Sequence, residues 1–223
     1  MPKLLRCVVV LLILTLLIGV PVAHSVQVQS RYRNLHVVHP GVLVRSGQLS
    51  EDALRSIVHD LGIKTVITLR DAETPGNPPP DEAEAQYCRE LEVHHIRLGY
   101  QAWISKNETS PAPVEPSVRK FVEIMNDPGN YPVLVHCWAG VHRTGAYCAI
   151  YRMEFDHWTN TEAIAELKSM GYDTLDDEWD ILGYLEDYWP SWKGPPPDPG
   201  PKRRPGVKPG VQGRKPGKKR ESN

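Results

Sequence analysis

The run HCWAGVHRTG, residues 136–145, sets a cysteine and an arginine six positions apart around a glycine. It directly follows the apolar stretch Val133-Leu134-Val135, which predicts a buried strand, and a helix is expected to begin near Arg143. The loop between this strand and this helix must curl, so its amides can point inward at the positive end of the helix dipole. Such a loop predicts a phosphate trap with a nucleophile at its base.

Cys137 is the predicted nucleophile, because a helix N-terminus and a nearby cation both stabilise a thiolate. Arg143 presents a planar guanidinium that can hold two phosphoryl oxygens and follow them into the transition state, which a lysine cannot do. Gly140 leaves out a side chain where the backbone has to turn tightly and approach the phosphate. The chemistry expected of these three residues is nucleophilic attack on phosphorus.

The residues around this pair have expected supporting roles. The Thr144 hydroxyl is expected to donate to the Cys137 sulfur and help it leave, and His136 is expected to orient the loop rather than transfer protons. Gly145 is expected to let the helix pack close to the sheet. The residues whose backbone is expected to bind phosphate are Trp138, Ala139, Gly140, Val141, His142 and Arg143.

This loop resembles the active-site loop of the cysteine-dependent protein tyrosine phosphatase superfamily, and its domain resembles the dual-specificity branch, especially small bacterial enzymes. His136, Gly140, Thr144 and Gly145, added to the Cys–Arg spacing, disfavour the alternative of a core cysteine in a sheet-to-helix turn. The resemblance continues less sharply through residues 39–50 and 63–71, and it covers roughly residues 30–190. It implies a hydrolase that forms a phosphocysteine intermediate and needs no metal or organic cofactor.

The general acid is the largest gap in the resemblance. Relatives place an aspartate on a mobile loop about 30 residues before the nucleophile, where it protonates the leaving oxygen. Here no aspartate lies between Asp81 and Asp127. Glu108 is the only carboxylate in residues 99–113 and is the first candidate, although a solvated loop charge explains it equally well; Asp71 is the second candidate. Residues 107–109 also form a glycosylation sequon, meaningful only in a eukaryotic secretory route.

The elements expected to position the site make a single α/β domain with a central, mostly parallel sheet flanked by helices. Ligands of such sheets bind at the carboxyl ends of the strands, where residues 70–71, residues 99–108 and the cysteine loop all emerge. Expected strands are a hairpin of 37–38 with 43–44, then 64–69, 94–98 and 132–136. Expected helices are 51–61 closed by Gly62, a surface helix 81–92, then 115–127, 143–157, 161–170 and 176–189.

Residues 1–25 have the pattern of an export signal. Lys3 and Arg6 precede an apolar run over 7–20, and a small-residue stretch, 22–25, suits cleavage before Val26. The run of 14 residues is short for a membrane span of about 20, so a cleaved signal is favoured over an uncleaved membrane anchor. A buried core helix is disfavoured, because the run is apolar on every face. The expected location is therefore periplasmic or secreted.

Residues 194–223 form a Pro/Gly/Lys/Arg-rich tail that cannot bury a core, and it is expected to be disordered. It holds nine Lys/Arg and two Asp/Glu, whereas residues 26–193, the expected phosphatase domain, hold 15 Lys/Arg and 25 Asp/Glu. The tail is interpreted either as a solubilising linker or as an arm that contacts an anionic surface. The sequence predicts no metal cluster and no specific nucleic-acid partner, and it leaves the oligomeric state open.

Removing the signal leaves Cys88, Cys137 and Cys148, an odd number that excludes a fully paired disulfide framework. Cys148 is expected in the core of the helix after the loop. Cys88 is expected either in the core or as a resolving thiol for Cys137, because a reactive thiolate in an oxidising compartment is prone to sulfenic acid formation.

The expected function is an exported phosphomonoesterase acting on a phosphorylated protein or a small phosphate ester. The loop carries no lysine, unlike relatives that favour highly phosphorylated inositols, so phosphotyrosine and then phosphoserine or phosphothreonine substrates are favoured. An inositol phosphate or phosphoinositide phosphatase is the alternative. A phosphate-binding module that has lost turnover is an alternative of another class. Sulfur transfer on a rhodanese-like loop is disfavoured by Thr144 and Gly145.

Overall fold

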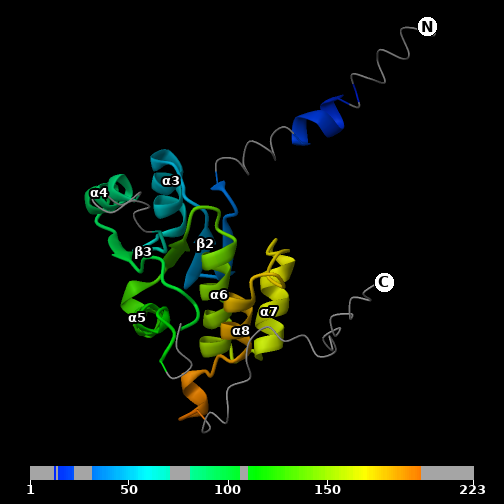
Figure 1. Ribbon diagram of the computed structural model, residues 1–223. Coiled ribbons are helices and arrows are strands. Elements are labelled where there is room, and N and C mark those ends of the chain that lie inside the picture. Colours follow the sequence, from blue (N-terminus) through cyan, green and yellow to red (C-terminus); the bar gives the residue numbers. More distant parts are fainter. Residues whose placement is uncertain (1–12, 14, 23–31, 71–80, 106–109, 197–223) are drawn as a thin grey trace, which may run out of the picture.

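The computed structural model describes residue 13 and residues 15–22, 32–70, 81–105 and 110–196. A five-stranded sheet with strand order β1-β2-β5-β3-β4 runs through the molecule (Figure 1). Only β1 is antiparallel to its neighbour, and the remaining pairs are parallel. The expectation of a mostly parallel sheet in an α/β domain is confirmed. The strands are β1 His36–His39, β2 Leu43–Ser46, β3 Thr65–Thr68, β4 His94–Arg97 and β5 Val133–His136.

The register brings the ends of the three central strands to one edge of the sheet. His136, the last residue of β5, lies opposite Ser46 of β2 and Thr68 of β3. The chain segments that leave these three strands therefore start side by side. This edge is the carboxyl-end position at which open α/β sheets bind ligands.

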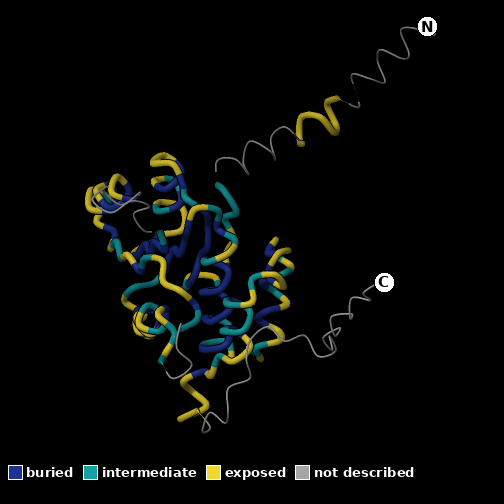
Figure 2. The backbone as a smooth tube through the Cα atoms, in the orientation of Figure 1, coloured by how far each residue is buried: buried dark blue, intermediate teal, exposed yellow. Residues whose placement is uncertain are grey.

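Six α-helices in the described part of the chain cover the two faces of the sheet (Figures 1 and 2). Successive side chains of β5 point to opposite faces of the sheet, so the strand contributes to the hydrophobic cluster on each face. Val133 and Val135 belong to one cluster, and Leu134 belongs to the other. The smaller cluster is covered by α3 and α4, and the larger by α5 to α8. The helices are α3 Glu51–Leu61, α4 Glu82–Glu90, α5 Glu115–Met125, α6 His142–Phe155, α7 Asn160–Ser169 and α8 Trp179–Glu186.

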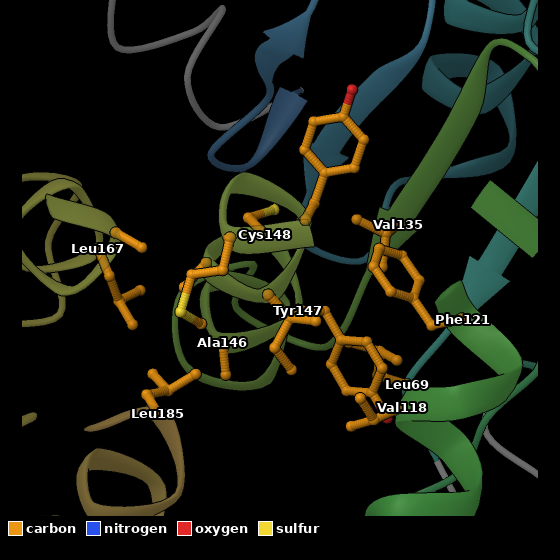
Figure 3. Packing of buried hydrophobic residues seen from close by; sticks show 14 of the residues in the cluster. Leu69, Val118, Phe121, Val135, Ala146, Tyr147, Cys148, Leu167 and Leu185 are labelled. Carbon is orange, nitrogen blue, oxygen red and sulfur yellow. The ribbon is translucent and has the colours of Figure 1, made fainter. Parts of the chain in front are cut away.

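Helix α6 forms the centre of the larger layer. Ten residues of α6 are buried. Figure 3 shows Tyr147 of α6 reaching toward Phe121 of α5, while Leu167 and Leu185 lie on the opposite side of α6. The Tyr147 and Phe121 rings pack edge to face with centroids 5.2 Å apart. The helix that starts at the cysteine loop is thus fixed by packing on both sides.

Local signals set the ends of several helices as the sequence predicts. The Ser50 side chain accepts a hydrogen bond from the Ala53 amide at the start of α3, and Gly62 ends that helix with φ 64°. The strands and helices expected from the sequence all form, with ends shifted by a few residues. The helix expected at 81–92 lies on the surface as α4, with one face buried at Glu84, Ala85, Tyr87 and Cys88.

The terminal segments lie mostly outside the described residues. Residues Thr15–Gly19 form a short π-helix, η1, with no buried residue. No helix within the described residues is long and apolar enough to cross a membrane. The predicted signal (1–25) and tail (194–223) are therefore described only in part, and both remain predictions.

Candidate active site

Cys137 lies at the carboxyl end of the central strand β5, with only 4% of its surface exposed. The following residues curl back to the start of α6 at His142. The Gly140 amide donates to the Cys137 sulfur across 3.3 Å. The cysteine loop, residues 137–143, thus closes over its own sulfur as the sequence predicts.

Three successive carbonyls of this loop are bound from outside. The Trp138 oxygen accepts from the Gln48 amide at 2.9 Å, the Ala139 oxygen from Asn34 Nδ2 at 2.9 Å, and the Gly140 oxygen from Arg45 Nη2 at 2.6 Å. Because N–H and C=O of a trans peptide point in opposite directions, the amides of residues 139–141 are turned the other way. A row of amides oriented in this way is the geometry of an anion-binding nest.

Gly140 is required by this geometry. Its φ of +76° is disfavoured for residues with a side chain, and a Cβ would lie 2.4 Å from the Gly47 nitrogen and 2.5 Å from the Ser46 carbonyl carbon. The neighbour is backbone and cannot move aside. Gly145 differs from expectation, because its missing Cβ would meet a Leu167 side-chain atom of α7 at 2.1 Å, so it allows close helix–helix packing rather than helix–sheet packing.

Arg143 stands on the first turn of α6 and is partly buried. One guanidinium nitrogen donates to the Leu69 carbonyl at 2.9 Å, and the Tyr100 ring centre lies 5.2 Å from the guanidinium carbon. The contact with Leu69 anchors the side chain beside the loop, and a guanidinium has five N–H donors to share. The remaining donors are available to phosphoryl oxygens, as the resemblance implies.

His136, for which the sequence predicts an orienting role, is buried directly before Cys137. It is 1% exposed, and its Nε2 lies 2.7 Å from Glu84 Oε1 while its Nδ1 lies 3.4 Å from the Cys137 carbonyl oxygen. Glu84 also contacts His95 Nε2 at 3.2 Å and accepts from Gln48 Nε2 at 2.6 Å. Burial raises the pKa of Glu84, but the hydrogen bonds and charges of His136 and His95 outweigh it and bring the pKa to about 2. A buried carboxylate therefore fixes the histidine that precedes Cys137.

Arg45 of β2 supports the loop from below. It is 1% exposed and donates from Nη2 to the Gly140 oxygen and from Nη1 to the Met170 sulfur at 3.1 Å. Its Nε has no hydrogen-bond partner, and within the described residues no carboxylate lies within ion-pair distance of it. Sequence reasoning missed both Arg45 and Glu84. For Arg45 the available signal was a charged residue inside an otherwise buried strand, whereas Glu84 lies in an acidic helix start that gives no such signal.

The other predicted loop residues differ in their surroundings. Thr144 is fully buried and its hydroxyl has no hydrogen-bond partner, so the expected bond to the Cys137 sulfur is not formed here. His142 is exposed and its ring stacks on Tyr172, with centroids 4.5 Å apart. Val141 is partly buried against the larger cluster. The two candidates for the general acid, Glu108 and Asp71, lie outside the described residues.

Cys88 and Cys148 are buried free thiols. Burial raises the pKa of Cys88 to about 12 and the pKa of Cys148 to about 11. Cys88 belongs to the smaller hydrophobic cluster and Cys137 to the larger one, on the other face of the sheet. Cys148 is in the core as expected, and the core interpretation of Cys88 is favoured over a resolving thiol. Among the described residues no group of His, Cys, Asp and Glu could hold a metal ion.

A family model described as "DSP-PTPase phosphatase fused to NAD+ Kinase" matches residues 20–178, which include every element from β1 to α7. The chain belongs to this family. The matched part is the phosphatase with its cysteine loop, and the assignment to the dual-specificity and tyrosine phosphatases agrees with the resemblance seen in the sequence.

Individual relatives have names of the same class. The chain is 34% identical over 123 residues to OCA1 of Mycosarcoma maydis, which is named provisionally as a tyrosine-protein phosphatase. The matched residues cover 55% of this chain and 70% of that protein. It spans 57% of the OCA1 of Meyerozyma guilliermondii. It is also 37% identical over 54 residues to the dual specificity protein phosphatase TpbA of Pseudomonas aeruginosa, covering 24% of this chain and 25% of TpbA.

Among solved structures, the Siw14 catalytic core superposes with a TM-score of 0.55 over 70% of this chain and 85% of that one, at 20% identity. At this identity the likeness shows a shared fold. It agrees with the assignment of the family model.

Proposed function

We propose that this protein is a phosphomonoesterase whose nucleophile is Cys137. The thiolate attacks phosphorus, an S–P bond forms, and the P–O bond to the substrate oxygen breaks. Water then attacks the phosphocysteine, which releases phosphate and restores the thiolate. The single observation that carries the proposal is the inward-turned row of amides around the Cys137 sulfur, held by three outside donors to the loop carbonyls.

Arg143 and the loop amides would hold the phosphoryl oxygens during both steps, since they form a fixed set of donors around the sulfur. Trp138, Ala139, Val141 and His142 contribute backbone to this set. The proposed mechanism needs no metal ion, as the resemblance implies. Thr144 remains the proposed donor to the sulfur as it leaves, because its buried hydroxyl has no other partner in the described residues.

The preferred substrates in this proposal are phosphotyrosine and then phosphoserine or phosphothreonine in proteins. TpbA, a relative in sequence, is named a dual specificity protein phosphatase, and a solved TpbA structure holds pTyr. The alternative is an inositol phosphate, since a relative 28% identical over 139 residues, SIW14 of Saccharomyces cerevisiae, is named an inositol diphosphatase. A phosphate-binding module without turnover is the alternative of another class.

Two variants and a substrate panel test this proposal. Cys137→Ser should abolish turnover and still bind phosphate analogues, because the nest of amides is retained. Arg143→Lys should keep the charge and lose most of the rate, because a lysine cannot hold two oxygens. The panel compares nitrophenyl phosphate, a phosphotyrosine peptide, a phosphoserine peptide and inositol phosphates. Binding of phosphate with no turnover of any substrate would favour the module, and a preference for inositol phosphates would favour the alternative substrate.

We propose Glu108, and Asp71 as the second candidate, for the general acid. A general acid matters most for a poor leaving group such as a serine alkoxide and little for nitrophenoxide. Glu108→Gln should therefore slow a phosphoserine or phosphotyrosine peptide far more than nitrophenyl phosphate, while Asp71→Asn is near-silent. The reverse pattern would assign the role to Asp71. No leaving-group dependence in either variant would exclude both.

We also propose that residues 1–25 direct export and are removed, so that the mature protein begins near Val26. Intact-mass measurement on protein from its native host tests this. A mass that includes residues 1–25 in the membrane fraction would favour an anchor, and a full-length chain in the cytoplasm would exclude both. The basic tail (194–223) is proposed to be dispensable for turnover of a small aryl phosphate.

A further inference from the structure

Two arginines from outside the cysteine loop lie against Trp138. The guanidinium carbon of Arg33 lies 4.2 Å from the Trp138 ring centre, and that of Arg70 lies 4.8 Å from it. Both distances are measured to the same ring centre, so the two guanidinium carbons lie no farther apart than these two distances added together. Trp138 directly follows the nucleophile and is 55% exposed. Positive charge is therefore concentrated beside the phosphate loop, on residues far away in the sequence.

Both cations are held in place by the fold. The Arg33 carbonyl accepts from the Gly47 amide at 2.6 Å, and its Nη1 donates to the Trp138 oxygen at 3.4 Å. The Arg33 side chain covers Gly47 so closely that a Cβ there would lie 2.7 Å from its Cγ and Cδ. Arg70 donates from Nη1 to Gln48 Oε1 at 2.9 Å. Little side-chain entropy remains to be lost when these groups bind a ligand.

These arginines lack the acidic partners that others have. Arg97 and Arg152 bind carboxylates at 2.9 Å and 2.7 Å, but within the described ranges no carboxylate lies within 4.0 Å of Arg33 or Arg70. Each guanidinium has five N–H donors, and few of them are used. A pair of fixed cations with spare donors is suited to an anion.

We propose that Arg33, Arg70 and Trp138 form a second anion subsite, which binds an acidic side chain next to the phosphorylated residue of a peptide. The inference rests on the phosphatase activity proposed above and names its substrate class. The carboxylate of the substrate would bind the spare donors of Arg33 or Arg70 beside the Trp138 ring while its phosphate occupies the cysteine loop.

The aromatic side chains around the loop favour a peptide over an inositol polyphosphate as the ligand. Trp138 is 55% exposed and Tyr100, whose ring lies over Arg143, is 51% exposed. Such rings bury apolar surface, which a phosphotyrosine ring and neighbouring side chains provide. An inositol polyphosphate carries mainly charged and hydroxyl groups on its rim and gains less from these rings.

The test compares two phosphotyrosine peptides of otherwise identical sequence. The Glu peptide carries Glu on both sides of the phosphotyrosine, and the Gln peptide carries Gln at the same two positions. The Glu peptide should have a kcat/KM roughly tenfold higher, mostly through KM, and the ratio should shrink as salt is raised. Arg33→Gln and Arg70→Gln should each lower the ratio toward one, and Arg33→Glu should favour a Lys-flanked peptide. The ratio is measured within each protein preparation, so a loss of folded protein does not affect it.

Arg119→Gln is the matched control, since it removes an exposed arginine paired with Glu115 on α5 and should leave the ratio unchanged. Turnover of nitrophenyl phosphate separates the two proposals, because its absence defeats the phosphatase assignment itself. Turnover with equal kcat/KM for both peptides would overturn the subsite alone. The subsite would also be overturned if the ratio of kcat/KM between the Glu and Gln peptides stays the same in both Arg→Gln variants. A preference for an inositol polyphosphate over the Glu peptide that depends on Arg33 would overturn it as well.

Discussion

Glu84 and Arg45 are both buried beside the cysteine loop, but the protein gives them very different partners. Glu84 has two histidines and a glutamine within hydrogen-bond distance, all from other elements of the fold. Arg45 has one loop carbonyl, one sulfur and an unpaired Nε. A buried polar group without a hydrogen-bond partner costs free energy of folding, so the Arg45 side chain carries a cost that the fully paired Glu84 carboxylate does not. Glu84 is completed by the protein, whereas Arg45 keeps an unpaired donor and holds the loop from the side opposite its inward-turned amides.

The difference extends to the residues next to these charges. Glu84 fixes His136 before Cys137, and Arg45 fixes the Gly140 carbonyl after it. Thr144, which is also buried with an unpaired hydroxyl, follows Cys137 in the chain, as Gly140 does. Stability is expected to depend on the Glu84 side, and catalysis on the Arg45 side, as is common where function retains unsatisfied groups.

The largest expected effect is that of Arg45→Met on turnover. Loss of the buried cation and of its bond to the Gly140 oxygen should lower kcat on nitrophenyl phosphate by about 100-fold, comparable to loss of one oxyanion donor. The free energy of unfolding should change by only about 1 kcal/mol, because an uncompensated buried charge is removed as well. Steady-state kinetics and urea unfolding on the same preparation measure both.

Arg152→Met is the matched control, because Arg152 of α6 is paired with Glu166 and Asp156 at 2.7 Å each. It should destabilise the fold by about 3 kcal/mol and change kcat little. The comparison fails if Arg45→Met behaves like Arg152→Met, with a large loss of stability and near-normal kcat.

Glu84→Gln should give the second largest effect, mainly on stability. The amide leaves a donor facing the donors of His136, His95 or Gln48, so we expect a loss of about 2–4 kcal/mol and a roughly tenfold lower kcat. Urea unfolding at pH 7 and a thermal melt measure the loss. A variant as stable as the wild type would show that the buried carboxylate is not needed.

The same carboxylate predicts a pH dependence. The pKa of Glu84 falls from 4.5 to about 2 on folding, so its contribution is complete above about pH 4.5 and is lost as the pH falls toward 2. The shift corresponds to about 3 kcal/mol. Wild-type unfolding free energy should therefore drop across this window by about that much more than in Glu84→Gln. Parallel curves for the two proteins would contradict the assignment.

Thr144→Val should give the smallest effect. Removing an unpaired buried hydroxyl should leave stability unchanged or raise it by about 1 kcal/mol. If the hydroxyl assists the leaving sulfur, hydrolysis of the phosphocysteine should slow several-fold while its formation is unaffected, which a burst phase in rapid-mixing kinetics would reveal. A uniform loss in both steps would instead indicate that Thr144 only packs.

The sequence predicts those parts of this site that are local in the chain. The strand Val133–His136, the loop turn at Gly140 and the helix after it follow from apolar runs and glycine placement, and the structure has them. The charges that support the loop are not local, because Glu84 and Arg45 reach it from a helix and a strand 52 and 95 residues away. An acidic helix start such as 81–84 is typical of an exposed surface, so its burial could not be read from the pattern.

Trapping the covalent intermediate tests the central claim most directly. Wild-type protein, and Thr144→Val to slow release, would be mixed with nitrophenyl phosphate, quenched in acid and examined by intact and peptide mass spectrometry. The account predicts a mass increase of one phosphoryl group, located on the peptide that carries Cys137 and absent from Cys137→Ser. Turnover of the substrate with no phosphoryl group on Cys137, or with one on another residue, would contradict it.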